Sequence, residues 1–417
     1  MAADFSSLVR NVLEAKANEL WDVSKFLWAN PETALRETKA HDRLCEFLER
    51  QGFNVSRRHY MDTAFRAEYS APGGTDGPTV ALMAEYDALP DIGHGCGHNL
   101  VSQSVLGAAV AVKEVMNKVT NLSGKIVVLG TPAEEDNVGK ITLLEKGAFD
   151  DINVAMTAHP GAQDVLKTAF SASQKLTVTY TGKAAHAAVS PWDGVNAADA
   201  AVSAYFSLAM LRHRIKDTSR ILALIEDCGQ YPNIITESSR LVCHVLTPDP
   251  DEDLDALQAR AERCLCAAAH ATGCKATIAR GRRCRLFAHN DALVRAYRSH
   301  GTKLGVHFVD MDLTRVVPTG GASDAANVSH EVPTLLPEFA IGSVQDRHTW
   351  EFAQAAGSES AQAPTRRASQ MLALTALDVF ADPQLLPRAR KDLAEWKAAR
   401  RSPCTCPTMA GSGSKAV

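Results

Sequence analysis

Four short apolar runs dominate the pattern of this chain, and each ends shortly before a group of titratable side chains. The runs are TVALMA (79–84), KIVVLG (125–130), VAMTA (154–158) and LLPEFAI (335–341). Short apolar runs bounded by breaker residues are typical of buried strands, although Pro337 weakens the fourth. Segments with helical character lie between them, such as residues 102–117. This alternation predicts an α/β fold with a mostly parallel sheet.

Residues 172–286 follow a different order. An alternating strand, a long helix, two strands, a second helix and a final strand succeed one another, which is the βαββαβ order of a ferredoxin-like unit. We predict that this unit is inserted into the α/β domain, which then comprises residues 1–171 and 287–385. Residues 386–417 form a tail that is charged and then rich in Ser, Gly and Pro, and we expect it to be largely disordered, with the disorder beyond Arg401.

The charge and the cysteine content of the chain indicate which classes of partner are excluded and in which cellular compartment the protein is expected. A formal net charge of −4 argues against a nucleic-acid or membrane-surface partner. No apolar run reaches the roughly 18 residues of a membrane span. The first residues predict an amphipathic helix and not a secretory signal. The ten cysteines at irregular spacings therefore predict reduced thiols and a cytoplasmic protein, with Cys404 and Cys406 as exposed thiols.

The polar groups that follow the four runs together indicate a metal site. They are Asp87, Cys96 and His98 after the first run, Glu134 and Glu135 after the second, His159 after the third and His348 after the fourth. Ligands of open α/β sheets bind outside the carboxyl ends of the strands, so these groups should converge. Considered alone, each has an ordinary structural interpretation. His159 alone would be a hydrogen-bonded histidine, Glu134 and Glu135 a solvated turn, and Cys96 a small buried apolar residue. Their joint occurrence favours metal, because Cys, His and carboxylate bind zinc and its neighbours.

The adjacent pair Glu134 and Glu135 indicates the chemistry of such a site. One carboxylate can bind metal while the other faces a water whose pKa the metal lowers towards ~7. The free carboxylate can then accept the proton of that water and later pass it to a leaving amine. The pattern therefore predicts metal-assisted hydrolysis of an amide bond.

Several longer motifs carry a family resemblance. They are WANPETALRE (28–37), EYDALPDIGHGCGHN (85–99), GTPAEED (130–136), AHP (158–160), GKAAHAAVSPWDGVNAADA (182–200), PNII (232–235), GGASDAANVS (320–329) and HTWEFAQAAGS (348–358). No single motif is specific, but the combination resembles the M20 metallopeptidases, in the branch of amidohydrolases and aminoacylase-like enzymes. The resemblance covers residues 20–382 in the order of the family.

The resemblance implies a site for two divalent metal ions. The implied ligands are Cys96, His98, Glu135, His159 and His348. The soft cysteine favours zinc, although manganese or cobalt can use the same ligands. Asp87 would not bind metal itself but would orient one of the metal ligands.

The same resemblance implies how the site works. Glu134 would be the general base and acid. His186, on the inserted unit, would stabilise negative charge on the substrate carbonyl oxygen. In relatives this histidine often comes from the partner subunit, so a homodimer formed through the inserted unit, which also acts as a lid, is expected. The implied substrate contacts are Asn233, Gly321 and Ser323.

Within the family, the chain most resembles dipeptidases for dipeptides with a basic C-terminal residue, such as β-alanyl-lysine. Two departures bear on this. Many relatives carry His-x-Asp where this chain has Glu85-Tyr86-Asp87. Relatives also place an arginine, which can bind the substrate carboxylate, where this chain has Leu246, and Arg240 lies six residues earlier.

Three alternatives stay open. The chain could be an aminoacylase or another N-acyl-amino-acid amidohydrolase. It could be a thiol hydrolase with Cys96 as nucleophile and His98 as base. It could also be a catalytically inactive metal-binding scaffold, although the presence of Glu134 with every implied ligand argues against this.

Overall fold

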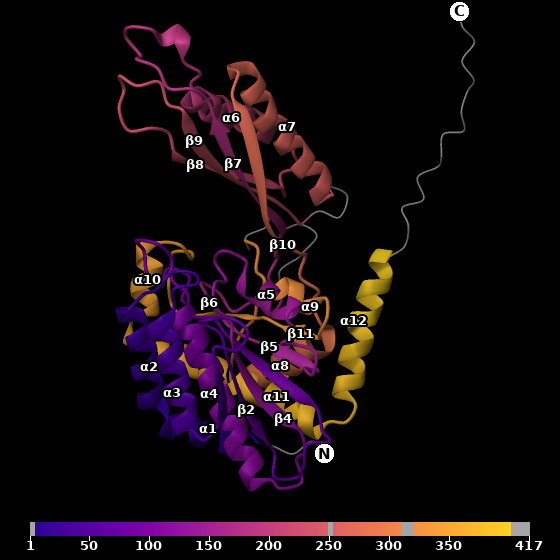
Figure 1. Ribbon diagram of the computed structural model, residues 1–417. Coiled ribbons are helices and arrows are strands. Elements are labelled where there is room, and N and C mark those ends of the chain that lie inside the picture. Colours follow the sequence, from indigo (N-terminus) through magenta and orange to yellow (C-terminus); the bar gives the residue numbers. More distant parts are fainter. Residues whose placement is uncertain (1–4, 249–252, 310–320, 402–417) are drawn as a thin grey trace, which may run out of the picture.

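The computed structural model describes residues 5–248, 253–309 and 321–401. Figure 1 shows two parts, a larger body that contains most of the helices and a smaller part, made of a sheet with helices on it, that stands apart. The smaller part connects to the larger one at the ends of strands β7 (Ala172–Thr181) and β10 (Lys275–Cys284).

The larger body is built around a six-stranded sheet with the order β1-β2-β4-β3-β5-β11. Its strands are β1 (Asn54–Arg57), β2 (Phe65–Ser70), β3 (Thr79–Ala84), β4 (Lys125–Gly130), β5 (Val154–Met156) and β11 (Thr334–Leu335). The β4-β3, β3-β5 and β5-β11 pairs are parallel, and β2 is antiparallel to β1 and β4. This confirms the predicted α/β fold with a mostly parallel sheet. The edge strands β1 and β2 were not predicted.

The fourth apolar run forms two strands and not one. β11 ends before Pro337, and β12 (Glu338–Ala340) then pairs in parallel with β6 (His159–Gly161) in a separate two-stranded sheet. Pro337 has no N–H to donate, which interrupts the strand. Its carbonyl oxygen accepts a hydrogen bond from the backbone N–H of His159 at 2.9 Å. The interruption therefore aligns the segment before His348 with the segment that carries His159.

Alternating side chains give the six-stranded sheet two buried faces. Val80 and Leu82 pack in one core cluster with apolar residues of the helices α1 (Ser6–Ala15), α2 (Ala17–Ala29), α3 (Thr38–Arg50), α4 (His98–Lys118), α8 (Asp291–Lys303) and α11 (Gln362–Ala381). Ala81 and Met83 pack on the opposite face with residues of the helices α5 (Gly139–Glu145) and α9 (Ala325–Ser329). α4 is buried along most of its length, as expected of a helix rich in Ala and Val. The sheet is thus fixed from both sides, and its carboxyl edge is held rigidly.

The four-stranded sheet has the order β10-β7-β9-β8, and its neighbouring strands are antiparallel. The element order is β7, α6 (Ala197–Leu211), β8 (Arg220–Asp227), β9 (Ser238–Thr247), α7 (Leu254–Thr272), β10, as the sequence pattern predicts. One face packs on α6 and α7 in its own core, to which Leu241, Cys243 and Val245 belong. The alternate residues of β9, among them His244 and Leu246, lie on the other face, which the two helices leave open.

The segment after residue 385 begins with a helix that the sequence did not predict. α10 (Trp350–Ala356) and α11 are followed by α12 (Leu385–Arg401), which ends where disorder is expected to begin. Its buried residues Ala389 and Leu393 show that it is held by packing. Residues 402–417, with Cys404 and Cys406, lie outside the described residues. No helix among the described residues is long and apolar enough to cross a membrane.

Candidate metal centre

The loop after β3 positions two of the implied ligands. It runs from Glu85 to Gly97, and α4 begins at His98. Gly97 has a φ of +80°, and a Cβ atom there would lie 2.5 Å from Cγ of Pro160. Only glycine fits this close approach. The loop is therefore pressed against the segment that carries His159.

Cys96, His98 and His159 form one group of ligand atoms. The Sγ of Cys96 lies 3.6 Å from Nε2 of His159, and the rings of the two histidines have centroids 5.5 Å apart. One ligand atom from each residue lies within 4.8 Å of the others. All three side chains are buried. This arrangement can hold one ion with a soft sulfur and two ring nitrogens.

Cys96, Glu135 and His348 form a second group of the same dimensions. The Nε2 of His348 lies 3.5 Å from a carboxylate oxygen of Glu135. His348 has a φ of +65°, in the left-handed region that non-glycine residues seldom adopt. A hydrogen bond from its N–H to the carbonyl oxygen of Gly95, at 2.9 Å, holds it there. Because both groups share Cys96, the ligand set provides for two ions side by side.

Asp87 lies behind the ligands and contacts two of them. Its Oδ1 lies 3.1 Å from Nδ1 of His98, and its Oδ2 accepts a hydrogen bond from the backbone N–H of Glu135 at 2.9 Å. A proton on Nδ1 leaves Nε2 of His98 free to bind metal. The pKa of Asp87 is lowered despite its burial, because His98 favours the carboxylate. Asp87 thus has the geometry expected of a residue that orients a ligand.

Unpaired atoms show that these residues fit metal ions. The Nε2 of His98 and one carboxylate oxygen of Glu135 are buried and have no hydrogen-bond partner. Such groups are costly to bury unless something binds them. Burial and the Arg347 guanidinium also lower the pKa of His159, which favours the neutral, metal-binding ring. The donor set of sulfur, ring nitrogen and carboxylate oxygen suits zinc and its neighbours.

The same burial disfavours Cys96 as a nucleophile. Burial, reinforced by the Glu135 carboxylate, raises the pKa of the Cys96 thiol. Catalytic thiols have lowered pKa values, so a metal-free thiol hydrolase is a poor match. A metal ion must displace the thiol proton on binding, which is the usual behaviour of a ligand cysteine.

Glu134 lies beside the ligands and belongs to neither group that contains Cys96, although its carboxylate also lies within 4.8 Å of ligand atoms of His98 and Glu135. It is buried, and its Oε2 lies 3.8 Å from Nε2 of His98. Burial, with the Glu85 carboxylate nearby, raises the pKa of Glu134. A raised pKa suits a carboxylate that accepts a proton and later donates it.

A buried ionic cluster lies next to Glu134, and its central cation was not singled out from the sequence. The Nζ of Lys140, on α5, lies 2.8 Å from Oε1 of Glu85 and 2.5 Å from Oδ1 of Asp324. These three side chains are almost fully buried. Glu85 therefore pairs with a lysine. A lysine in a helical pattern ordinarily indicates a solvated face, so nothing local distinguished Lys140.

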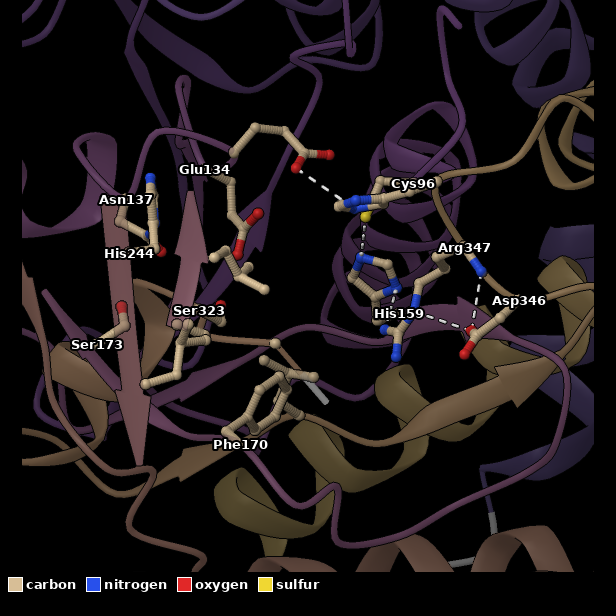
Figure 2. A pocket seen from close by; sticks show the side chains of 17 residues that line it. Cys96, Glu134, Asn137, His159, Phe170, Ser173, His244, Ser323, Asp346 and Arg347 are labelled. Carbon is tan, nitrogen blue, oxygen red and sulfur yellow. Dashed lines mark hydrogen bonds and ion pairs between the residues drawn. The ribbon is translucent and has the colours of Figure 1, made fainter. Parts of the chain in front are cut away.

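A cleft of about 400 Å³ opens in front of the ligands and is lined by residues of both parts of the molecule. Cys96, Glu134, Glu135, His159 and His348 contribute to it from the larger body, and Leu222, His244 and Leu246 from the four-stranded sheet. Figure 2 shows Cys96 and His159 facing each other on one side of the cleft and His244 on the other. The implied substrate residues Gly321 and Ser323 also line it.

Two residues implied as functional lie elsewhere. His186 and Asn233 are exposed and are not among the cleft-lining residues. They lie close together, since the backbone N–H of Ala187 donates to the carbonyl oxygen of Asn233 at 3.0 Å. Nδ1 of His186 accepts a hydrogen bond from the N–H of Ala188. Within one chain the structure therefore does not bring His186 to the metal ligands.

The architecture and the ligand set define a class of protein. Residues 81–353 match the peptidase family M20/M25/M40, and the chain belongs to this family of hydrolytic enzymes. It is 40% identical to the Xaa-Arg dipeptidase of Mus musculus over 94% of this chain and 93% of that protein. It is also 40% identical to the Xaa-Arg dipeptidase of Homo sapiens over 91% and 90% of the two chains.

The solved structures show the same fold. A dinuclear metal binding peptidase of the M20 family from Bacillus subtilis superimposes with a TM-score of 0.62 at 18% identity, over 88% of this chain and 99% of that one. An aminobenzoyl-glutamate utilization protein from Klebsiella pneumoniae gives a TM-score of 0.65 at 19% identity, over 87% and 96%.

Metal removal should destabilise the protein. Dialysis against a chelator leaves Nε2 of His98 and a carboxylate oxygen of Glu135 without a partner. We expect the midpoint of thermal unfolding to fall, because an ion present at about 1,000 times its dissociation constant contributes about 4 kcal/mol. Calorimetry before and after chelation, and again after zinc is added back, measures this. An unfolding midpoint that changes neither after chelation nor after zinc is added back would contradict the metal assignment.

Proposed function

We propose that the chain is a metal-dependent dipeptidase that hydrolyses dipeptides with a basic C-terminal residue, such as β-alanyl-lysine. The observation that carries this proposal is Glu134, a buried carboxylate that lies beside the ligand cluster and is absent from both groups that contain Cys96. Family membership supports the reaction class. The names of the mouse and human relatives, Xaa-Arg dipeptidase, support the basic C-terminal residue.

In the proposed reaction, Cys96, His98, Glu135, His159 and His348 would hold the two ions, which would supply Lewis-acid activation of a water and of the substrate carbonyl. Glu134 accepts the proton of the attacking water and donates it to the leaving amine. Asp87 holds His98 in the orientation that leaves Nε2 free for metal. Gly321 and Ser323 contact the substrate from the wall of the cleft.

Zinc is the proposed metal, because Cys96 supplies a soft ligand shared by both groups. Manganese and cobalt can use the same ligands, and metal analysis of the purified protein distinguishes them. The proposed compartment is the cytoplasm. All eight described cysteines are free thiols, as is usual in a reducing environment.

A homodimer through the inserted unit, proposed as residues 172–286, would complete the site. α6 carries exposed apolar side chains, namely Val202, Tyr205, Phe206 and Met210. A row of this kind on one helix is typical of an interface. His186, which lies outside the cleft of its own chain, would then enter the site of the partner. The proposed unit would also serve as the lid, since β8 and β9 contribute Leu222, His244 and Leu246 to the cleft.

His186→Ala should slow hydrolysis without loss of metal. Removing one donor to a developing oxyanion costs about 10²–10³-fold in kcat. The measurement is steady-state kinetics beside metal analysis. His213→Ala is the matched control, because His213 is also on the inserted unit and outside the cleft. A kcat equal to that of the unaltered protein would remove His186 from the reaction.

Mixed dimers test whether the site is shared. His186→Ala and Glu134→Gln would each be nearly inactive alone. Co-expressed in equal amounts, they should recover about a quarter of full activity, because half of the dimers are mixed and one site in each has both residues intact. Absence of recovery in a verified mixed dimer would mean that His186 acts in its own chain or not at all.

The substrate is tested with a panel of dipeptides and N-acyl amino acids. Metal-loaded protein is incubated with each compound and the products are identified by mass spectrometry. We expect cleavage of β-alanyl-lysine and related dipeptides with C-terminal Lys or Arg. Cleavage of N-acyl amino acids alone would indicate an amidohydrolase, and cleavage of none would indicate a scaffold without activity.

A further inference from the structure

Two charged side chains of the cleft have no part in metal binding or proton transfer. Among the described residues that line the cleft, Arg347 supplies the only arginine or lysine side chain, and Asp346 supplies a carboxylate that belongs to neither ligand group. Both precede His348 directly in the chain. Figure 2 shows them next to His159, across the cleft from His244.

The guanidinium of Arg347 is held by contacts with neighbouring side chains. Nη2 of Arg347 donates to Oε1 of Glu338 at 2.9 Å, and Nη1 lies 3.4 Å from Nδ1 of His159. The side chain is 17% exposed, so it reaches the cleft without being free to move through solvent. A guanidinium has five N–H groups in one plane, and Glu338 accepts from Nη2 alone. N–H groups that Glu338 does not use can bind a substrate carboxylate.

The carboxylate of Asp346 is more exposed to solvent than the guanidinium of Arg347. The Asp346 side chain is 72% exposed, and its Oδ1 accepts the backbone N–H of Arg347 at 2.8 Å. The Nε of Arg347 lies 3.9 Å from the same oxygen, at ion-pair distance but beyond hydrogen-bond distance. The two charges thus form a loose pair through one oxygen of Asp346. The second carboxylate oxygen is available for a ligand cation.

The rest of the lining suits an aliphatic chain. Phe170, Leu222, Leu246 and Leu336 contribute apolar surface. Burial and the neighbouring Lys175 lower the pKa of His244, so its ring is uncharged near neutral pH. The residues that the four-stranded sheet contributes to the cleft lining include no arginine or lysine, namely Ser173, Leu222, His244 and Leu246. Lys175 lies beside His244 in the sheet and pairs with Asp136 at 3.1 Å.

We infer that Asp346 and Arg347 together recognise the C-terminal basic residue of the dipeptide, with Arg347 binding its carboxylate and Asp346 its side-chain cation. The inference rests on the proposed function and names the residues that set its specificity. A free C-terminal lysine or arginine carries one anion and one cation joined by an aliphatic chain. The cleft offers one cation and one anion beside an apolar wall, which is the complementary arrangement.

Three substrates separate the two contacts. They are β-alanyl-lysine, its C-terminal amide, which lacks the carboxylate, and β-alanyl-norleucine, which lacks the side-chain cation. The ratio of kcat/KM for the first to the second measures recognition of the carboxylate. The ratio for the first to the third measures recognition of the cation. Each is expected to exceed about tenfold for the unaltered protein, because a charge-assisted hydrogen bond is lost in each analogue.

A substitution of Arg347 or of Asp346 should weaken one of the two substrate preferences and leave the other in place. Arg347→Gln is expected to reduce the acid-to-amide ratio at least about tenfold, with Arg347→Lys recovering part of it. Asp346→Asn is expected to reduce the lysine-to-norleucine ratio similarly, because the carboxylate that binds the side-chain cation is lost. Arg240→Gln is the matched control, because Arg240 is an exposed arginine paired with Glu226 outside the cleft. It should change neither ratio.

Metal content and thermal unfolding are measured for every variant, since Arg347 contacts His159. If Arg347→Gln lowers kcat/KM equally for all three substrates, Arg347 only supports the metal ligands and its assignment fails. Should Asp346→Asn keep its preference for lysine over norleucine, its assignment fails as well, whatever Arg347→Gln does. If the unaltered protein hydrolyses none of the three, the proposed function is wrong and the pair has no such substrate.

Discussion

Glu134→Gln should bind metal normally and lose nearly all hydrolytic activity. The substitution keeps the size of the side chain but removes its ability to accept a proton, which costs about 10²–10⁴-fold in kcat. The ligand atoms of Cys96, Glu135 and His348 form a complete group without Glu134. Metal content, thermal unfolding and substrate KM should therefore stay close to their original values, and the loss should appear in kcat.

The matched control is a second acidic residue near the cleft. Asp136 pairs with Lys175 at 3.1 Å, is half exposed, and does not line the cleft. Asp136→Asn should leave kcat within about twofold, because surface ion pairs contribute little. Near-normal turnover by Glu134→Gln at full metal content would refute its role as the base.

Lys140→Met should destabilise the folded protein more than any other single change discussed above. The Nζ of Lys140 lies within 2.8 Å of Glu85 and Asp324 oxygens, and its side chain has no exposed surface. The substitution leaves two buried carboxylates without their cation. Removal of one partner of a buried ion pair costs about 3–5 kcal/mol in the free energy of unfolding. Urea denaturation measures this loss.

Two further measurements separate the ionic effect from a packing effect. Lys25→Met, which breaks an exposed pair with Asp22, should change the free energy of unfolding by less than about 0.5 kcal/mol. Burial raises the pKa of Asp324 to about 6 even beside Lys140. Because a carboxyl whose pKa is raised by folding stabilises the folded state as it gains a proton, Lys140→Met should regain stability as the pH falls from 7 towards 5.

If Lys140→Met unfolds at the same urea concentration as the unaltered protein, the cluster contributes nothing to stability. A loss that stays constant between pH 7 and pH 5 would point to packing instead of charge. Either result would contradict the prediction that charge pairing of Lys140 with Glu85 and Asp324 stabilises the folded protein.

Much of the architecture follows from local patterns. β3 and β4 occupy the residues predicted for them, Thr79–Ala84 and Lys125–Gly130, because short apolar runs between breakers have few other stable conformations in a globular core. The βαββαβ order of residues 172–286 is visible for the same reason. α12 escaped prediction because its isolated sequence is polar, and its burial against the larger body comes from contacts distant in the chain.

The ligand candidates were also accessible from sequence, since each follows an apolar run and parallel strands deliver their carboxyl ends to one edge of a sheet. The structure brings Cys96, His98, Glu135, His159 and His348 together as that rule requires. Their roles in catalysis stay predictions. Lys140 and Arg347 were missed because a single lysine or arginine in a polar stretch is usually a solvated residue.

The sequence by itself predicted the central strands of the sheet, the βαββαβ order of residues 172–286 and a set of candidate metal ligands. These properties depend on residue type and on spacing along the chain. Only the tertiary structure decided that Lys140 meets Asp324 across 184 residues, that Arg347 stands beside His159, and that His186 lies outside the cleft of its own chain. Burial and charge pairing between distant segments depend on how the whole chain packs, and no local pattern encodes them.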